Sequence, residues 1–313
     1  MSFDRAVDRG AHLYESVRDA FGYLRHVRSA RALWRVVAPA PPLVLNAPAS
    51  ASTCLTGVGA AELAARLRMA GHALALEALD GPLRASSGPE PSSLAAIEAL
   101  VPALHLVTPE SLPSDAERVA FFLNLYNVLV LHGAAALGVR TSVLEEPTFF
   151  SAVAYRVGDA ILTPDRIEHG ILRRDAPHLG RRTLRRDDPA RAFLPRVVEP
   201  RIHAALVCAS ASCPPIAFYD PERLHEQLDR AARHLVSTHV RVARDVVRLP
   251  LVFRHYARDF EAYATRDDPF LPRGVREFVS AHAEPPLRAA VTAARRARYD
   301  PWDWRFGVSV RES

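Results

Sequence analysis

The sequence predicts an α+β fold in which a central buried helix packs against a small antiparallel sheet and is flanked by further helices. Three observations lead to this prediction. One helical stretch is apolar almost all the way round, which is typical of a helix at the centre of a domain. A hairpin pattern follows that stretch, and amphipathic helical patterns with their own caps follow the hairpin.

Length and composition allow one large domain or two smaller ones, because the 313 residues are 49% hydrophobic and 24% charged. We expect a helical extension over residues 1–109 and the main domain over residues 110–310. The net charge is +5, and all 40 basic residues are arginines. No run alternates arginines with aromatics, so we interpret the positive charge as a bias in amino-acid composition and expect no nucleic-acid partner.

The first 60 residues offer little chemistry. Residues 4–37 have the pattern of an amphipathic helix, which fits a packed helix better than one lying on a membrane. Prolines interrupt the apolar stretch at 36–48, so it cannot span a bilayer, and no signal-peptide pattern is present. Three cysteines do not make a disulfide framework, and Cys54 is expected to be buried and inert. We therefore expect a cytoplasmic protein without a transmembrane segment.

The central helix has a clear beginning. Ser114 and Glu117 form a capping box, and an apolar helix follows through residue 136. This helix carries Asn124 and Asn127 on one face, three residues apart. A buried amide without partners costs about 1–3 kcal/mol, so the pair predicts a polar network, either structural or forming the wall of a site.

A hairpin and a short helix come next. Residues 149–157 and 160–162 alternate as strands around a Gly158-Asp159 turn. Thr163 and Pro164 then begin a helix that carries Glu168, His169 and Arg173. An acid beside an imidazole is a candidate acid/base pair, while the plain alternative is a charged outer face.

The rest of the chain mixes strands and helices. An arginine-rich stretch, 173–201, is a candidate site for an anionic ligand or a solvated loop. Buried strands are predicted at Ile202–Cys208 and Val246–Leu249, and an aromatic tail is expected to pack back onto the domain. Further helices are predicted after Asp220 and at about 251–264, 274–283 and 287–298.

His203, Cys208 and Cys213 carry the candidate chemistry. Side chains alternate along a strand, so His203 and Cys208 should point to opposite faces, whereas Cys213 leaves the strand before two prolines and can meet His203. Cys208 is then expected to be an inert buried thiol. Three chemistries stay open: nucleophilic catalysis by Cys213, a zinc site, although H-x4-C-x4-C matches no common zinc motif, and a disulfide between Cys208 and Cys213.

Five segments in order resemble one family, the domain of unknown function 547 (DUF547). They are AFFLNLYN at 120–127, LTPDRIEHGILR at 162–173, EPRIHAALVCASASCPPI at 199–216, VFRHYARDF at 252–260 and YDPWDWRF at 299–306. The resemblance covers roughly residues 110–307. The chain departs from the family at Phe122, Glu199, Ala204 and Val207, where tryptophan, aspartate, phenylalanine and often asparagine are usual.

The resemblance implies no established reaction. In plants the domain occurs in leucine-zipper proteins described as ternary-complex factors, which suggests interaction with other proteins. The order of helix, hairpin and histidine strand is also similar to papain-like and transglutaminase-like folds, by analogy only. Those enzymes have a cysteine at the start of the central helix, where this chain has Asn124 and Asn127.

The leading hypothesis is a thiol-dependent hydrolase or acyltransferase acting on a small molecule or peptide. In it Cys213 attacks, His203 or His169 accepts its proton, and Glu168 and Asn127 orient groups. Substrate contacts are predicted for Asn124, Arg173 and Arg201. No metal or cofactor is expected. The alternative is a non-catalytic module that binds a protein partner and in which the same polar residues are structural.

Overall fold

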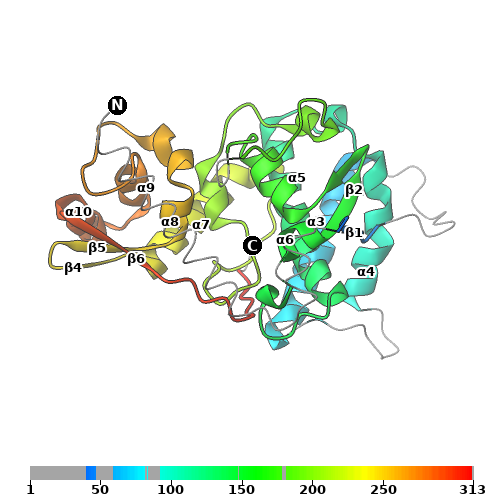
Figure 1. The fold of residues 1–313 in the computed structure, drawn as a ribbon, viewed down its shortest axis with the longest axis horizontal. Coiled ribbons are helices and arrows are strands. Elements are labelled where there is room, and N and C mark those ends of the chain that lie inside the picture. The colour runs from blue at the N-terminus through cyan, green and yellow to red at the C-terminus, as the bar shows by residue number, and fades with distance from the viewer. Residues whose placement is uncertain are drawn as a thin grey trace.

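Two hydrophobic cores organise the part of the chain that the computed structural model describes, residues 40–46, 59–81, 83, 92–146, 148–177 and 181–311. The predictions for residues 4–37 and for Cys54 lie outside these ranges. The larger core joins the segments between Leu63 and Leu228, and the smaller one lies mostly between Ala231 and Ala294. In Figure 1 the two cores form the cyan-green and the yellow-orange halves of the molecule.

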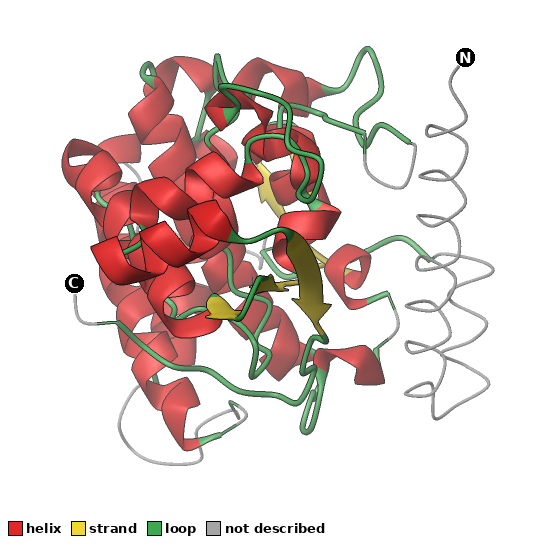
Figure 2. Cartoon of the chain, turned by 90° about the vertical axis from the view of Figure 1, so that its left-hand side faces the viewer, coloured by secondary structure: helices red, strands yellow, loops and turns green. Residues whose placement is uncertain are grey.

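The helices are α3 (Ala60–Glu77), α4 (Ser93–Leu100), α5 (Asp115–Ala136), α6 (Phe149–Ala152), α7 (Leu224–His239), α8 (Val252–His255), α9 (Val275–His282) and α10 (Pro285–Ala293). The strands are β1 (Leu43–Val44), β2 (Val153–Val157), β3 (Ala160–Leu162), β4 (Arg241–Ala243), β5 (Val246–Pro250) and β6 (Arg296–Asp300). Helices dominate and strands are short, as Figure 2 shows, so the predicted α+β class is confirmed.

Helix α5 is the buried centre that the sequence predicts. The Ser114 hydroxyl accepts the N–H of Glu117, and the Glu117 carboxylate accepts the N–H of Ser114. Every residue from Val119 to Ala134 is buried. By length and composition α5 is also the one described helix apolar enough to cross a membrane, but 89% of its apolar window is covered by the rest of the protein.

Helix α3 packs closely on α5 and extends the same core. A Cβ atom on Gly71 would lie 2.8 Å from Cγ2 of Val128, so only glycine lets the two helices approach this far. Leu67 and Leu74, on the same side of α3, are fully buried. The described residues before 109 therefore share the core of the main domain, and the division of the chain at 109/110 stays a prediction.

The first sheet has the order β1-β2-β3. Strands β2 and β3 form the predicted hairpin, but β1 runs parallel to β2, so the sheet is mixed rather than antiparallel. The predicted first strand begins too early, since Phe149–Ala152 is the short helix α6. A short apolar run fits a buried helical turn as well as a strand, which explains the error.

The second sheet, in the order β4-β5-β6, belongs to the smaller core. Strand β5 confirms the strand predicted at Val246–Leu249, pairing antiparallel with β4 and parallel with β6. The helix predicted at about 287–298 extends too far, because α10 ends at Ala293 and its predicted last residues begin strand β6. After β6 the tail, residues 301–311, returns to the larger core, where Trp304 and Phe306 pack as predicted.

Candidate functional site

The segment that carries the cysteines is not the predicted strand. Glu199 accepts the N–H of Arg201 and Pro200 takes the first position of a 3-10 helix, η8 (Pro200–Ala204). The chain then continues without regular structure to Cys208. The strand predicted at Ile202–Cys208 is therefore wrong, and the alternation of side chains along it does not apply.

Cys208 and Cys213 face each other within a short loop, residues 208–213, which we call the thiol loop. Their sulfurs lie 2.9 Å apart and both thiols are free. The N–H of Cys208 donates to Sγ of Cys213 at 3.1 Å, and the Ser210 hydroxyl lies 3.2 Å from the first sulfur and 3.3 Å from the second. Both cysteines are half-buried, so the expected contrast between a buried Cys208 and an exposed Cys213 is wrong, while the inertness of Cys208 stays a prediction.

The electrostatics of the loop distinguish the two thiols. Burial raises the pKa of Cys213, but hydrogen bonds from Cys208 and Ser210 outweigh it and lower that pKa to about 7. The hydrogen bond that Cys208 gives to Cys213, together with burial, raises the pKa of Cys208 well above its usual range. Near neutral pH the pair therefore favours one thiolate, on Cys213, and one thiol, on Cys208.

The tail holds the thiol loop in place. The indole N–H of Trp302 donates to the Ser210 hydroxyl at 2.8 Å, which orients the group that contacts both sulfurs. The N–H of Ala211 donates to the carbonyl of Arg305, also at 2.8 Å. The loop is thus fixed by a segment about ninety residues away in the chain.

Ala209, between the thiols, has a strained backbone. Its φ is +57° and it is fully buried. A left-handed conformation costs a residue with a Cβ atom about 1–2 kcal/mol. The carbonyl of Ala209 accepts the N–H of Gly307 of the tail, which helps to hold this conformation. Strain held in place by surrounding contacts is frequent at functional sites.

A second polar cluster lies on three helical turns. We call it the polar network: Glu168, His169, Arg173, His203 and Asp259. Arg173 donates to Asp259 through Nε at 2.5 Å and through Nη2 at 3.0 Å, and Asp259 lies 2.8 Å from Nε2 of His203. A third guanidinium nitrogen of Arg173 lies 3.1 Å from Nδ1 of His169.

The sequence explains how these residues are positioned. Thr163 accepts the N–H of Arg166 and so begins a wide helical turn, η6 (Arg166–Leu172), as predicted. Its π-helical geometry, a form frequent at functional sites, buries both Glu168 and His169. Asp259 comes from a separate turn, η10 (Ala257–Tyr263).

Charge pairing dominates the polar network. Burial raises the pKa of Asp259, but its bonds to His203 and Arg173 outweigh burial and lower it to about 2. Burial likewise opposes ionisation of Glu168, and the neighbouring His169 and other charges still lower its pKa. The network therefore packs two carboxylates against one guanidinium and two imidazoles.

Two tyrosines connect the network to its surroundings. Tyr256 stacks on His203 with ring centroids 4.1 Å apart and lies 4.8 Å below the Arg173 guanidinium. Burial raises the pKa of Tyr126, as do Glu168 and both cysteines of the thiol loop. Tyr126, on α5, is therefore near both the polar network and the thiol loop.

The predicted contact between Cys213 and a histidine is not formed. Among the described residues no hydrogen bond joins Cys213 to His203, whose Nε2 is engaged by Asp259. The partners of the Cys213 sulfur are Cys208 and Ser210. The sequence predicts one centre containing both residues, whereas the structure places Cys213 in the thiol loop and His203 in the polar network.

The two asparagines of α5 serve as anchors for loops. The Asn127 amide donates to the carbonyls of Ala205 and Ala217, and its oxygen accepts the N–H of Val207. Asn124 exchanges two hydrogen bonds with the backbone of Tyr219 in the same way. All of these partners are backbone groups, so the structural alternative accounts for both amides, and their roles in catalysis and substrate binding stay predictions.

The two arginines predicted to bind substrate have partners inside the protein. Arg173 belongs to the polar network, while Arg201 contacts Glu199, Asp229 and His225. Each nitrogen of both guanidinium groups has at least one such contact, and each group forms an ion pair. Substrate binding through the same N–H groups would therefore require an existing contact to open.

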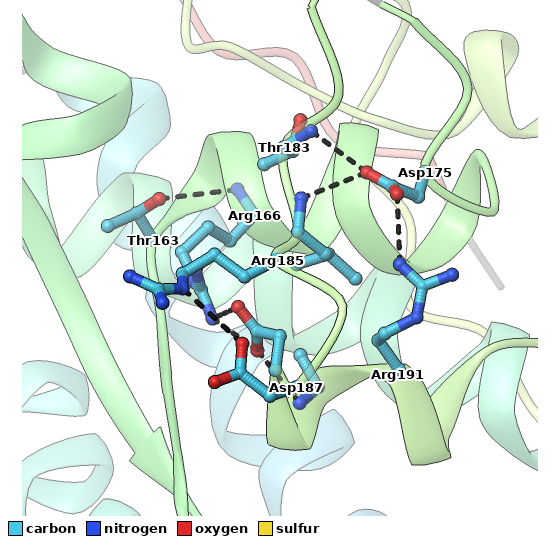
Figure 3. Close-up of polar contacts among 10 residues, drawn as sticks. Thr163, Arg166, Asp175, Thr183, Arg185, Asp187 and Arg191 are labelled. Carbon is cyan, nitrogen blue, oxygen red and sulfur yellow. Dashed lines mark hydrogen bonds and ion pairs between the residues drawn. The ribbon is translucent and has the colours of Figure 1, made fainter.

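An open cleft of about 570 Å³ lies beside the polar network, between β3, η6 and the turn at Pro189. Figure 3 shows three of the residues that line it, Thr163, Arg166 and Thr183. The Arg166 guanidinium donates to both carboxylate oxygens of Asp188, another lining residue. Asp165 also lines the cleft, 3.9 Å from Nε2 of His169. Partial burial and the charge of Glu168 raise the pKa of Asp165 to about 7. Asp165 is therefore a titratable group that lines the open cleft next to the polar network.

Several of these residues were not predicted from the sequence. Asp165 and Ser210 lie next to predicted site residues but had no signal of their own. Tyr256 and Asp259 lie in the segment VFRHYARDF, and Trp302 lies in YDPWDWRF. Both segments contribute to the resemblance, which was therefore the one available signal for these three residues.

The described residues contain no group of three or more histidine, cysteine or acidic side chains placed to hold a metal ion. His203, proposed as one ligand of a zinc site, is directed at Asp259.

Comparison with known protein families gives a match for the region that contains the thiol loop and most of the polar network. Residues 109–236 match the model of a protein family of unknown function, DUF547. The chain contains a DUF547 domain. The match includes the thiol loop and four of the five network residues, while Asp259 and the tail lie beyond it. The search of curated proteins found no significant match, and neither did the search of solved structures, so a papain-like fold stays a prediction.

Proposed function

We propose that the DUF547 domain is a thiol–disulfide oxidoreductase in which Cys213 is the nucleophile and Cys208 the resolving thiol. The observation that carries this proposal is the 2.9 Å separation of two free sulfurs, one with a pKa lowered to about 7. A disulfide bond is about 2.05 Å long. The sulfurs therefore need to move by less than about 1 Å to bond.

The reaction has two exchange steps. The Cys213 thiolate attacks one sulfur of a substrate disulfide, forms a mixed disulfide and releases the other sulfur as a thiolate that takes up a proton. Cys208 then loses its proton and attacks the Cys213 sulfur, which releases the second substrate thiol. The substrate disulfide is reduced to two thiols, and the protein dithiol is oxidised to the Cys208–Cys213 disulfide.

The surroundings of Cys213 suit this chemistry better than acyl transfer. Thiol–disulfide exchange needs a thiolate, and the Cys208 N–H and the Ser210 hydroxyl stabilise one. Hydrolysis of an amide also needs a general acid for the leaving group, and no imidazole is hydrogen-bonded to Cys213 in the described structure. Thiol-dependent acyl transfer with His203 as base stays the second candidate, because Tyr126 lies near both centres.

The proposal is tested by adding oxidised glutathione to the reduced protein and mapping disulfides by peptide mass spectrometry. We expect a Cys208–Cys213 disulfide in the native protein and a mixed disulfide trapped on Cys213 in the Cys208→Ser variant. Alkylation of Cys213 by iodoacetamide should show a midpoint near pH 7. Peptide mapping separates these thiols from Cys54.

Two variants separate the candidate functions. His203→Gln should leave the exchange rate within a few-fold, whereas an acyl transferase would lose its activity with this variant and keep it with Cys208→Ser. An alkylation midpoint near pH 8.5, the value of a free thiol, together with no internal disulfide would refute the oxidoreductase. A domain without either activity would support the non-catalytic binding module.

A further inference from the structure

Three buried polar atoms on one side of the larger core have no hydrogen-bond partner among the described residues. They are Oη of Tyr219, Nε of Arg230 and Nη2 of Arg311. Tyr219 is only 1% exposed, and both arginines are half-buried. A buried polar group without a partner costs about 1–3 kcal/mol, so three of them together require an explanation.

The backbone brings these three side chains to one place. In the tail the N–H of Arg311 donates to the carbonyl of Ile216 at 3.0 Å, three residues before Tyr219. On α7, Gln227 accepts the N–H of Asp220, so this part of the helix lies against the same loop. Arg230 lies one turn further along α7.

Electrostatics confirm that the groups are close to one another. The charges of Arg311 and Arg230 both act on the Tyr219 hydroxyl, whose pKa burial raises. Burial and the neighbouring Arg230 lower the pKa of Arg311. His234, one turn beyond Arg230 on α7, also has its pKa lowered by burial and by Arg311. Two cations and a hydroxyl therefore share a partly buried space and repel further positive charge.

Three other arginines with buried or half-buried side chains are neutralised. Arg173 pairs with Asp259, Arg276 with Asp268 and Arg201 with Glu199. For Arg230 and Arg311 the described ion pairs include no acidic partner. Of the acids on α7, Asp229 pairs with Arg201, and the exposed Glu226 bonds to Arg223, although its charge also reaches Arg230. Both positive charges are thus left for an external anion.

We propose that Tyr219, Arg230 and Arg311 form a binding site for the phosphate group of a small molecule. Guanidinium groups bind phosphate oxygens through paired N–H bonds, and the tyrosine hydroxyl adds one more donor. Two cations and a hydroxyl match a tetrahedral dianion better than a carboxylate, which offers two oxygens and one charge. The site lies outside the thiol loop and does not depend on the proposed oxidoreductase activity.

The test is a titration of the full chain with inorganic phosphate, followed by isothermal calorimetry and by the melting temperature. We expect saturable binding and a melting temperature that rises with phosphate concentration. Arg230→Gln and Arg311→Gln should each weaken binding by about 10- to 100-fold, as expected when a charged hydrogen-bonding partner is lost. Arg305→Gln is the matched control, because this arginine lies on the same tail but pairs with Asp303.

Folding of the variants can be checked independently. Because each glutamine removes an unpaired charge, the variants should melt no lower than the native protein in phosphate-free buffer. Absence of binding, or equal binding by all variants, would overturn the proposal. Acetate competing as well as phosphate would overturn the preference for a phosphate group. Binding that appears only after removal of residues 312–313 would show that the chain's own carboxylates occupy the site.

Discussion

The thiol loop and the polar network both lie near Tyr126 but differ in how their groups are paired. In the polar network each charged group contacts an oppositely charged or hydrogen-bonding neighbour, and Asp259 and Arg173 each bond to two side chains. In the thiol loop each sulfur has the other sulfur as its closest polar neighbour, and the backbone at Ala209 is strained. Paired charges stabilise a fold, whereas a strained loop that favours a thiolate keeps a reactive group available.

The comparison predicts that the polar network contributes most to stability. Asp259→Ala should lower the free energy of unfolding by about 3–5 kcal/mol, because it leaves Arg173 buried without its charge partner. Urea denaturation measures this effect. The control is Asp303→Ala, which breaks an exposed pair with Arg305 and should cost less than about 1 kcal/mol.

The same prediction has a pH dependence. The pKa of Asp259 is lowered from its usual 3.8 to about 2, so its stabilising effect is complete above pH 3.8 and is lost as the pH falls toward 2. The difference in stability between the native protein and Asp259→Ala should therefore shrink over that range. A difference that is small at pH 7, or constant down to pH 2, would contradict a stabilising ion pair.

Substitution of an asparagine on α5 should have a smaller effect on the free energy of unfolding, and at Asn127 it should also affect the thiol loop. Asn127→Ala should cost about 2–3 kcal/mol, since it leaves the Val207 N–H and two carbonyls without partners. Because Val207 precedes Cys208, the variant should also shift the pH midpoint of Cys213 alkylation upward.

Asn124→Ala is the control for this prediction. It removes two similar bonds to Tyr219, away from the thiols, and should destabilise the protein without moving the alkylation midpoint. Equal shifts in both variants would mean that general loosening of the fold, and not the anchoring of Val207, controls the thiolate.

Local signals in the sequence predicted local structure well. The capping box of Ser114 and Glu117 located the start of α5, and Thr163 located the start of η6, because a cap acts within three residues. The segment at 202–208 was assigned wrongly because its apolar residues satisfy a buried turn and a buried strand equally.

The arrangement of the site was harder to predict because its partners are distant in sequence. His203 meets Asp259 across 56 residues, and Ser210 meets Trp302 across 92. No periodicity or spacing encodes such pairs, which depend on how η8, η10 and the tail pack. Residue types alone predict a site containing His203 and Cys213, but only tertiary structure shows that the two residues lie in different clusters.

The smallest predicted effect tests whether strain in the thiol loop has a role. Ala209→Gly should raise the free energy of unfolding by up to about 1 kcal/mol, because glycine adopts a φ of +57° without a Cβ penalty. Arg244→Gly is the matched control, since Arg244 has the same φ in the exposed turn between β4 and β5.

Both glycine variants should therefore gain similar stability, but only Ala209→Gly should slow the alkylation of Cys213 at pH 7. The reason is that a freer Ala209 lets the Cys208 N–H move away from the Cys213 sulfur, which it now meets at 3.1 Å. Unchanged reactivity in Ala209→Gly would mean that the tail contacts alone hold the loop, so that the strain at Ala209 follows from the packing and does not tune the thiolate.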